Sequence, residues 1–272
     1  MRNIPFFKMT GSGNDFIIID NRDRKMDGID IKEFVVKTCA RCVSAGADGL
    51  FLIEPPKQGT DFSWQFYNSD GSVAEMCGNG SRCAARFAYL NGIAGKTMSF
   101  ETLAGIIEAE IKDEPNVKVR LTQPQDVRES YEIEVFGEKL EANSANTGVP
   151  HCVIFSDDIE NVDIMKYGRA LRFHEHYAPK GTNVNFCGVT NDGLLRVRTY
   201  ERGVEGETMA CGTGSVACSI FAVSKGLLKS PVTVKTTSGI LLKVYLEDGK
   251  VYLEGEARVV YTGEMSEEAF KY

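Results

Sequence analysis

The sequence predicts an α+β protein of two pseudo-symmetric domains, each an antiparallel sheet wrapped around a central helix. Two observations lead to this prediction. The chain repeats itself at a shift of 134 residues, and short strand-like segments surround each copy of the repeat. Patterns of long surface helices are few, so the sheet is expected to supply most of each domain.

The repeat is centred on two cysteines. Cys77-Gly-Asn-Gly-Ser81 matches Cys211-Gly-Thr-Gly-Ser215 at four of five positions, and the match continues without a gap, so that Phe87 falls on Phe221. Two copies are too few for a solenoid, which favours a duplicated two-domain protein. We expect one domain to comprise residues 1–115 plus 258–272 and carry Cys77. The other comprises residues 116–257 and carries Cys211, with the active site in the cleft between the two domains.

Each copy predicts one central helix. A glycine-rich turn follows the cysteine, and Gly92 or Gly226 stands where a helix commonly ends. Val216–Val223 is apolar almost all round, which is typical of a helix enclosed on every side. The first copy is similar but is interrupted by Arg82 and Arg86.

Alternating or β-branched segments predict the strands around these helices. A further helix is predicted near Ile31–Cys42, capped by Asp30, and another around Ile164–Leu171. Asp248-Gly249 is typical of a hairpin turn. The predicted strands are Phe62–Tyr67, Leu195–Thr199, Val232–Thr237, Ile240–Leu246, Lys250–Leu253 and Ala257–Tyr261.

The composition is that of a globular protein. The 272 residues are 43% hydrophobic and 25% charged, which excludes general disorder. A formal net charge of −7 argues against sequence-independent nucleic-acid binding. No apolar run approaches the ~20 residues that cross a bilayer, and the N-terminus lacks a signal-peptide pattern. We therefore expect a cytoplasmic protein that binds neither nucleic acid nor membrane.

The chain has eight cysteines, which we expect to be reduced in that compartment. Cys39-Ala-Arg-Cys42 has the spacing of a redox or zinc motif. The helical periodicity instead places both thiols on a buried stripe, where cysteine packs as a small hydrophobe. No second such pair completes a zinc site, and His174 and His176 lack a third ligand. No metal is expected.

Cys77 and Cys211 differ from the other cysteines because each directly precedes a helix. The free N–H groups of a helix start stabilise anions, so we expect a depressed thiol pKa and a place for a carboxylate or oxyanion. The alternative is that both cysteines only pack there and the glycines only make turns. Two thiols facing one carbon from opposite sides suit its inversion, one removing a proton and the other delivering one. No motif for pyridoxal phosphate is evident, and we expect no cofactor.

Two long segments, Asn68–Cys83 and Glu201–Gly214, resemble the two cysteine signatures of the diaminopimelate epimerase family. The order of further segments agrees, and the resemblance runs from about residue 6 to beyond residue 260. These further segments are Gly11–Phe16, Gly46–Gly49, Pro150-His151 and Gly181–Asn185.

The resemblance implies a cofactor-independent isomerase that converts LL-2,6-diaminopimelate to the meso form in lysine biosynthesis, and a homodimer. It makes Cys77 and Cys211 the acid/base pair, supported by His151 and Glu201. The residues that it implies for substrate binding are Asn14, Asn68, Gly78, Asn79, Asn183, Glu201, Arg202, Gly212 and Thr213.

Individual positions have plainer interpretations. An arginine such as Arg202 is usually a solvated surface group, and His151 alone is as well explained by a satisfied histidine at a strand start. The chain departs from the family where Val149 replaces the usual Asn before Pro-His, which leaves one polar substrate contact missing or replaced. It also has one residue more than the shortest family pattern, at Val204-Glu205.

Three competing functions stay open from sequence. A proline or hydroxyproline racemase would use the same paired cysteines. A non-catalytic binding protein for a dicarboxylic amino acid, or a thiol redox protein, would explain them without catalysis. The capacity of Arg202 for a second carboxylate favours diaminopimelate.

Overall fold

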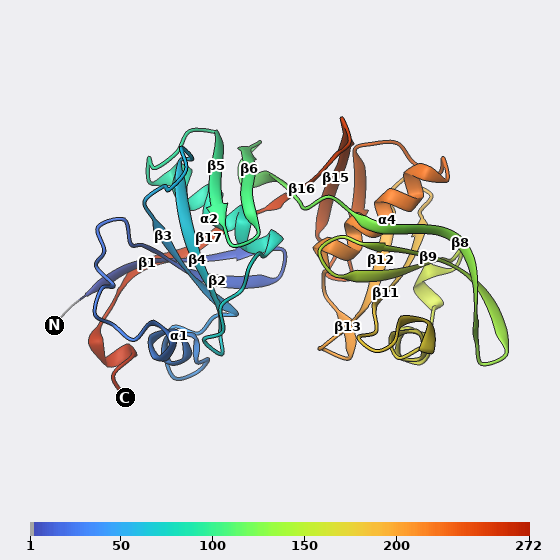
Figure 1. The fold of residues 1–272 in the computed structure, drawn as a ribbon, viewed down its shortest axis with the longest axis horizontal. Coiled ribbons are helices and arrows are strands. Elements are labelled where there is room, and N and C mark those ends of the chain that lie inside the picture. The colour runs from blue at the N-terminus through green and yellow to red at the C-terminus, as the bar shows by residue number, and fades with distance from the viewer. Residues whose placement is uncertain (1–2) are drawn as a thin grey trace. The chain divides into compact units, whose positions relative to one another are not determined.

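In a computed structural model, which describes residues 3–272, the chain forms two compact units (Figure 1). The first unit ends at Val119 and resumes with Gly255–Tyr272, and the second is Arg120–Glu254. The predicted boundaries lie a few residues from these. The first unit is discontinuous because the C-terminal strand β17 (Arg258–Met265) pairs antiparallel with the N-terminal strand β1 (Ile4–Gly11).

Both units consist mainly of strands, with short helical segments between them. The first unit contains β1, β2 (Asn14–Asp20), α1 (Ile31–Cys39), β3 (Gly49–Glu54), β4 (Phe62–Asn68), α2 (Gly78–Leu90), β5 (Thr97–Thr102), β6 (Gly105–Ile111), β7 (Asn116–Arg120), β17 and a short helix, η4 (Glu267–Ala269). The second contains β8 (Gln125–Val135), β9 (Glu138–Asn146), β10 (Pro150–Phe155), η1 (Ile159–Asn161), η2 (Ile164–Gly168), α3 (Arg169–Arg172), η3 (Glu175–Tyr177), β11 (Asn183–Val189), β12 (Leu195–Glu201), β13 (Gly206–Thr208), α4 (Gly212–Ser224), β14 (Val232–Lys235), β15 (Leu241–Glu247) and β16 (Lys250–Glu256).

The two units share one strand order. The neighbours in the first are β17-β1-β2-β3-β4-β5-β6, and those in the second are β8-β9-β10-β11-β12-β14-β15. In both, the third and fifth pairings are parallel and the other four are antiparallel. The internal duplication predicted from sequence is therefore confirmed at the level of topology.

The predicted α+β architecture is confirmed, but the sheets are mixed rather than antiparallel throughout. Parallel neighbours need a crossover connection, and here the helices supply it. In the first unit α1 joins β2 to β3 and α2 joins β4 to β5. In the second, η2 with α3 joins β10 to β11, and α4 joins β12 to β14. The central helix of each unit is thus the crossover connection that allows its two flanking strands to pair in parallel.

Helices α2 and α4 have 13 residues each and keep the shift of 134. Both end before a glycine with positive φ, Gly92 at +65° and Gly226 at +70°. Ser215–Ser219 and Phe221 of α4 are buried, which confirms the prediction of an enclosed helix.

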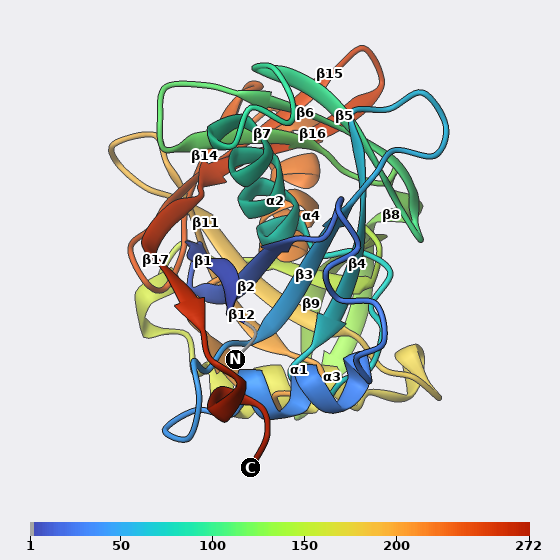
Figure 2. The same ribbon diagram turned by 90° about the vertical axis from the view of Figure 1, so that its left-hand side faces the viewer.

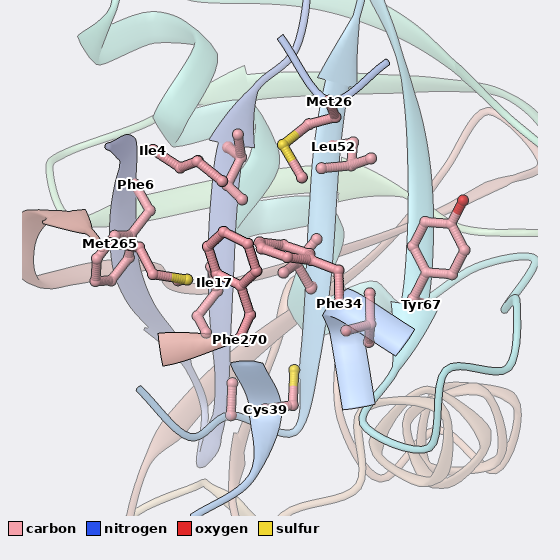
Figure 3. Packing of buried hydrophobic residues seen from close by; sticks show 14 residues of the cluster. Ile4, Phe6, Ile17, Met26, Phe34, Cys39, Leu52, Tyr67, Met265 and Phe270 are labelled. Atoms are coloured by element: carbon pink, nitrogen blue, oxygen red, sulfur yellow. The ribbon is translucent and has the colours of Figure 1, made fainter. Parts of the chain in front are cut away.

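The sheet of the first unit has a helix on each face. Leu50 and Leu52 of β3 pack with Phe34 of α1 in one buried cluster (Figure 3). Phe51, between them, points to the opposite face because side chains alternate along a strand. There it lies against the start of α2. Figure 2 shows β3 between the two helices.

All six predicted strands are present, with ends shifted by up to four residues. The predicted cap of α1 is confirmed, since Oδ1 of Asp30 accepts from the N–H of Glu33 at 3.1 Å. The placement of Cys42 on the buried stripe was wrong. The helix ends at Cys39, whose carbonyl accepts from the N–H of Ala47, and Cys42 lies exposed in the turn with φ of +66°. No helix among residues 3–272 has the length and apolar character needed to span a membrane.

Candidate active site

Cys77 and Cys211 are the N-cap residues of α2 and α4. Each has extended backbone, with φ/ψ of −146°/115° and −130°/109°. The Sγ of Cys77 accepts from the N–H of Gly80 at 3.4 Å, and that of Cys211 from the N–H of Gly214 at the same distance. The repeated sequence therefore encodes a repeated capping structure, in which sulfur occupies the position of the usual oxygen acceptor.

The expected depression of the thiol pKa values was wrong. Burial raises the pKa of Cys77, and it raises that of Cys211 to about 11 with a further contribution from the charge of Glu201. The N–H groups at both helix starts act in the expected direction and lower the pKa values. Loss of solvent around the thiolate outweighs them.

The third residue of each helix must be glycine. A Cβ at Gly80 would lie 2.2 Å from Cζ of Phe51, and one at Gly214 would lie 2.2 Å from Oδ1 of Asn185. Both distances are far inside van der Waals contact. Each helix start is thus pressed against a strand of its own unit, β3 or β11, and this contact fixes where the cysteine stands.

A chain of side-chain hydrogen bonds connects the polar residues of the first unit. Nδ2 of Asn14 donates to Oδ2 of Asp48 at 3.0 Å, and Nδ2 of Asn79 donates to Oδ1 of Asn14 at 2.8 Å. Oδ1 of Asn79 accepts from Nη2 of Arg82 at 2.7 Å. A carboxylate only accepts and a guanidinium only donates, so the two ends of the chain fix both amide orientations. Asn68 is exposed at the end of β4, where it pairs with Gly49.

Arg82 is fully buried one turn into α2. Besides Asn79, it donates to the hydroxyl of Ser12 at 2.7 Å and to the carbonyl of Gly78 at 3.3 Å. Among the described residues no carboxylate forms an ion pair with it. A guanidinium with only neutral partners is unusual, because buried charges are normally paired.

In the second unit, Asn185 of β11 fixes the tautomer of His151. Nδ2 of Asn185 donates to the carbonyl of Cys152 and lies 3.0 Å from Nδ1 of His151. Oδ1 of Asn185 accepts from the hydroxyl of Thr199 at 3.0 Å. Because the Cys152 carbonyl requires a donor, the amide cannot be reversed, and Nδ1 is the acceptor. His151 therefore carries its proton on Nε2.

The imidazole of His151 is held neutral. Burial is the main cause that lowers its pKa to about 3, and the positive charge of Arg202 contributes in the same direction. Its Nε2 is buried and has no hydrogen-bond partner within residues 3–272. A buried N–H donor without a partner is costly, so this atom is available to a ligand.

Hydrogen bonds also involve other predicted residues of the second unit. Oδ1 of Asn183 accepts from the backbone N–H of Arg202 at 2.9 Å, and Nδ2 of Asn183 donates to the carbonyl of Pro150. Thr213 has its hydroxyl 3.5 Å from the Cys211 sulfur, and its carbonyl accepts from Thr147. In the part of the chain that the structure describes, the guanidinium of Arg202 has no carboxylate partner.

The structure thus brings the predicted residues together in two groups, one in each unit. The first group consists of Cys77, Gly78, Asn79 and Asn14, with Asn68 on the strand beside Gly49. The second consists of Cys211, Gly212, Thr213, His151, Asn183, Glu201 and Arg202. His174 and His176 are not predicted to bind a metal. His174 is the N-cap of the short helix η3, and its Nδ1 accepts from the N–H of His176 inside that helix.

Sequence reasoning missed the roles of Arg82, Asp48, Asn185 and Thr199. A signal for two of them was present in the repeat. At the shift of 134, Arg82 falls on Val216 and Phe51 falls on Asn185, so these are positions where a polar side chain in one copy meets an apolar one in the other.

The inserted residue near the second cysteine has a defined structure. Glu205 adopts φ of +58°, and its Oε1 accepts from Nε of Arg172 at 3.1 Å and from the N–H of Gly203. The turn after Arg202 is thereby fixed to α3. Val149, where the family has a polar residue, accepts through its backbone carbonyl from the N–H of Thr147.

The chain has the fold of a class of solved structures that includes PhzF-family proteins and a hydroxyproline epimerase. A PhzF-family protein of Bacillus anthracis matches with a TM-score of 0.73 at 14% identity, over 98% of this chain and 100% of that one. A hydroxyproline epimerase of Agrobacterium vitis, solved with trans-4-hydroxy-L-proline, matches with a TM-score of 0.68 at 15% identity, over 98% and 93%. These identities establish the fold alone.

The chain belongs to the diaminopimelate epimerase family. The family model matches residues 6–127 and 143–260. A diaminopimelate epimerase of Hydrogenobaculum sp. is 53% identical over 97% of this chain and 99% of that protein. One of Aquifex aeolicus is 51% identical over 99% and 100%, and one of Archaeoglobus fulgidus is 44% identical over 96% and 95%.

Proposed function

We propose that this protein is an isomerase that converts LL-2,6-diaminopimelate to meso-2,6-diaminopimelate, without a cofactor, by acid/base catalysis with Cys77 and Cys211. The observation that carries the proposal is that each copy of a duplicated unit places one cysteine as the cap of its central helix. Membership of the diaminopimelate epimerase family supports the choice of substrate.

The proton balance of the reaction is simple. The thiolate of one cysteine takes the proton from the α-carbon, and the electron pair of that C–H bond passes into the α-carboxylate. The thiol of the other cysteine gives its proton to the opposite face and becomes the thiolate. The carbon is inverted, no atom is lost, and the two sulfurs have exchanged roles. In this proposal both thiols act on one substrate from opposite faces.

Stabilisation of the carbanion is the demanding step, because an α-proton of an amino acid is weakly acidic. The helix starts provide N–H groups without partners inside the helix, at Gly78 and Asn79 and at Gly212 and Thr213. In the proposal they bind the α-carboxylate and stabilise the charge that develops on it.

The distal end of diaminopimelate carries a second carboxylate and an ammonium group. Arg202, whose guanidinium has no ion-pair partner within residues 3–272, is assigned to that carboxylate. Asn14, Asn68 and Asn183 are assigned to further polar contacts with the substrate. This requirement for a cation distinguishes the proposal from a racemase for free proline.

Two residues are assigned to support the thiols. His151, neutral with its proton on Nε2, is a hydrogen-bond donor in this proposal and not a base. The negative charge of Glu201 raises the pKa of Cys211, and so favours the protonated form of that cysteine.

The proposal is tested by isotope exchange. Purified protein is incubated in D2O with diaminopimelate or with proline, with no cofactor added, and deuterium at the α-carbon is measured by mass spectrometry. We expect deuterium in diaminopimelate and none in proline. The variants Cys77→Ala and Cys211→Ala should each lose exchange and epimerisation, whereas the matched control Cys42→Ala, at an exposed cysteine, should retain both.

Each competing function gives a different result in this experiment. A proline racemase would label proline instead of diaminopimelate. A binding protein or a thiol redox protein would label neither substrate. An active Cys77→Ala or Cys211→Ala variant would contradict the two-thiol mechanism while leaving the substrate assignment intact.

We further propose that the enzyme acts in the cytoplasm, in lysine biosynthesis, as a homodimer. Sedimentation equilibrium at micromolar concentration tests the assembly, and a single species of 30.0 kDa would contradict the dimer. The pathway is tested by complementation: the cloned gene should let a strain that requires lysine and diaminopimelate grow without these supplements.

A further inference from the structure

The two half-sites differ in charge in spite of their shared geometry. Arg82 lies five residues after Cys77, and the corresponding residue of the other copy, five after Cys211, is Val216. Both side chains are buried, Arg82 completely and Val216 to 1% exposure. The same interior position therefore holds a cation in one unit and an alkyl group in the other.

The charges that face the two sulfurs have opposite net effects. At Cys77 the positive charge of Arg82 favours the thiolate and lowers the pKa, and the more weakly coupled carboxylate of Asp48 opposes it. At Cys211 the charged neighbour is Glu201, which disfavours the thiolate. Burial raises both pKa values and the helix-start N–H groups lower both, and the hydroxyl of Thr213 also lowers that of Cys211. The sign of the neighbouring charge is therefore the difference that favours earlier ionisation of Cys77.

Arg82 also lacks the partner that a buried cation requires. Its hydrogen bonds go to the side chains of Ser12 and Asn79 and to backbone carbonyls, all of them neutral groups. Its burial lowers its own pKa, while the nearby thiols Cys83 and Cys77 are the groups whose negative charge would raise it. Cys83 is fully buried, with its pKa raised to about 12, which leaves Cys77 as the thiol that can supply the counter-charge.

We propose that Arg82 is a positioning residue that makes Cys77 the first of the two cysteines to ionise and leaves Cys211 as the thiol. Its catalytic meaning rests on the proposed function: Cys77 is then the sulfur that becomes the proton acceptor, and Cys211 is the one that keeps a proton to donate. The reverse reaction begins only after the two have exchanged protonation states.

Arg82 has a second effect through Asn79. By donating to Oδ1 of Asn79, it turns Nδ2 of that amide toward Asn14. One guanidinium therefore both supplies charge beside the sulfur and sets the orientation of two amides assigned to substrate binding. In the second unit the imidazole of His151 is oriented differently, by Asn185 and Thr199 on two strands of the sheet.

The test measures the two thiols separately and without substrate. Wild-type protein is treated with iodoacetamide from pH 6 to 11, and alkylation of the peptides containing Cys77 and Cys211 is followed by mass spectrometry. Because only the thiolate reacts, the pH dependence of each rate gives each thiol pKa. We expect Cys77 to titrate at a lower pH than Cys211. The opposite order would overturn the proposal without any variant being needed.

Variants then assign the difference to Arg82. In Arg82→Met we expect the Cys77 titration to move up by about one pKa unit or more, as for loss of a nearby opposite charge, with Cys211 unchanged. Arg82→Lys, which keeps the charge, should stay near wild type. Arg86→Met is the matched control, one turn further along α2, because Arg86 already pairs with Glu114 at 3.1 Å.

A purely structural role for Arg82 predicts a different pattern. Arg82→Met and Arg82→Lys would then impair folding or activity alike, while the Cys77 titration stayed where it is in wild type, and that result would overturn the proposal. The alkylation measurement needs no turnover. Failure of the deuterium exchange would therefore refute the proposed function, whereas the alkylation experiment would still determine which of the two thiols has the lower pKa.

Discussion

The side-chain amide of Asn185 donates to Nδ1 of His151 at 3.0 Å and thereby decides which imidazole nitrogen carries the proton. The pairing belongs to one copy of the duplication only. By the strand register that the units share, Asn185 corresponds to Phe51 and His151 to Phe16. The sheet face beside the central helix therefore carries aromatic rings at these two positions in the first unit. In the second unit the same two positions form a hydrogen-bonded network beside the start of α4.

Exchange of Asn185 for Asp, which is nearly isosteric, should reverse this tautomer. A carboxylate cannot donate to Nδ1, so the proton is expected on Nδ1, and the negative charge should raise the His151 pKa. Loss of the Nε2 donor should lower kcat roughly 10–100-fold, the range typical of a lost orienting contact, with a smaller change in KM. Nitrogen-15 NMR of the histidine ring reports the tautomer directly.

Asn143→Asp is the control for that substitution. Asn143 is equally buried on β9, but its amide contacts the N–H of Ser130 and the carbonyl of Val153, not His151. It should leave the His151 spectrum unchanged. A wild-type tautomer in Asn185→Asp would show that another group fixes the imidazole.

Acid should destabilise the protein through His151. Its pKa is lowered from 6.5 to about 3 in the fold. Between these values the unfolded chain binds a proton that the folded chain does not, so the free energy of unfolding falls as the pH falls, by about 1.4 kcal/mol per pH unit from this group. Urea denaturation at a series of pH values should show a smaller slope in His151→Gln than in wild type. An equal slope would mean that His151 is accessible to protons in the folded protein.

Carboxylates with lowered pKa values form a background to the acid experiment that every variant shares. Carboxylates such as Asp15, whose pKa is lowered beside Arg41 and Lys8 in spite of its burial, contribute at still lower pH and are common to all variants.

The sequence was sufficient to find the duplication, the two central helices and the two cysteine caps. These features follow from local rules: a repeated motif, a run of helical periodicity, and glycines at helix ends. Cys42 marks the limit of such rules, because α1 ends through hydrogen bonds that its last two carbonyls, of Thr38 and Cys39, accept from residues further along the chain.

The thiol pKa values and the supporting residues depend on packing that no local pattern contains. The helix start at Cys77 was recognised, but not the loss of solvent that outweighs it. Arg82 was noted only as an interruption of an apolar helix, since its partner Ser12 lies 70 residues away. Asn185 could not be connected with His151 before the parallel pairing of β10 and β11 was known.

The pH dependence of epimerisation should have a high descending limb. Catalysis needs one thiolate and one thiol, so kcat/KM rises as the first sulfur ionises and falls when the second does. With the Cys211 pKa at about 11, the fall is expected near that pH. In Glu201→Gln the negative charge is removed, and the descending limb should move to lower pH. An unmoved limb would exclude Glu201 as the charge acting on Cys211.

Alanine at the third position of α2 should displace Cys77 while leaving its chemistry intact. The new Cβ in Gly80→Ala would lie 2.2 Å from the ring of Phe51, so the helix start must shift or the ring must move. We expect a loss of about 1–3 kcal/mol in unfolding free energy, as for overpacking elsewhere, and a larger loss of kcat than of substrate affinity. Gly95→Ala, at an open position of the same unit, should be neutral. The double variant Gly80→Ala, Phe51→Leu removes the ring and should regain part of both losses; if it regains neither, contact with Phe51 is not what positions the cysteine.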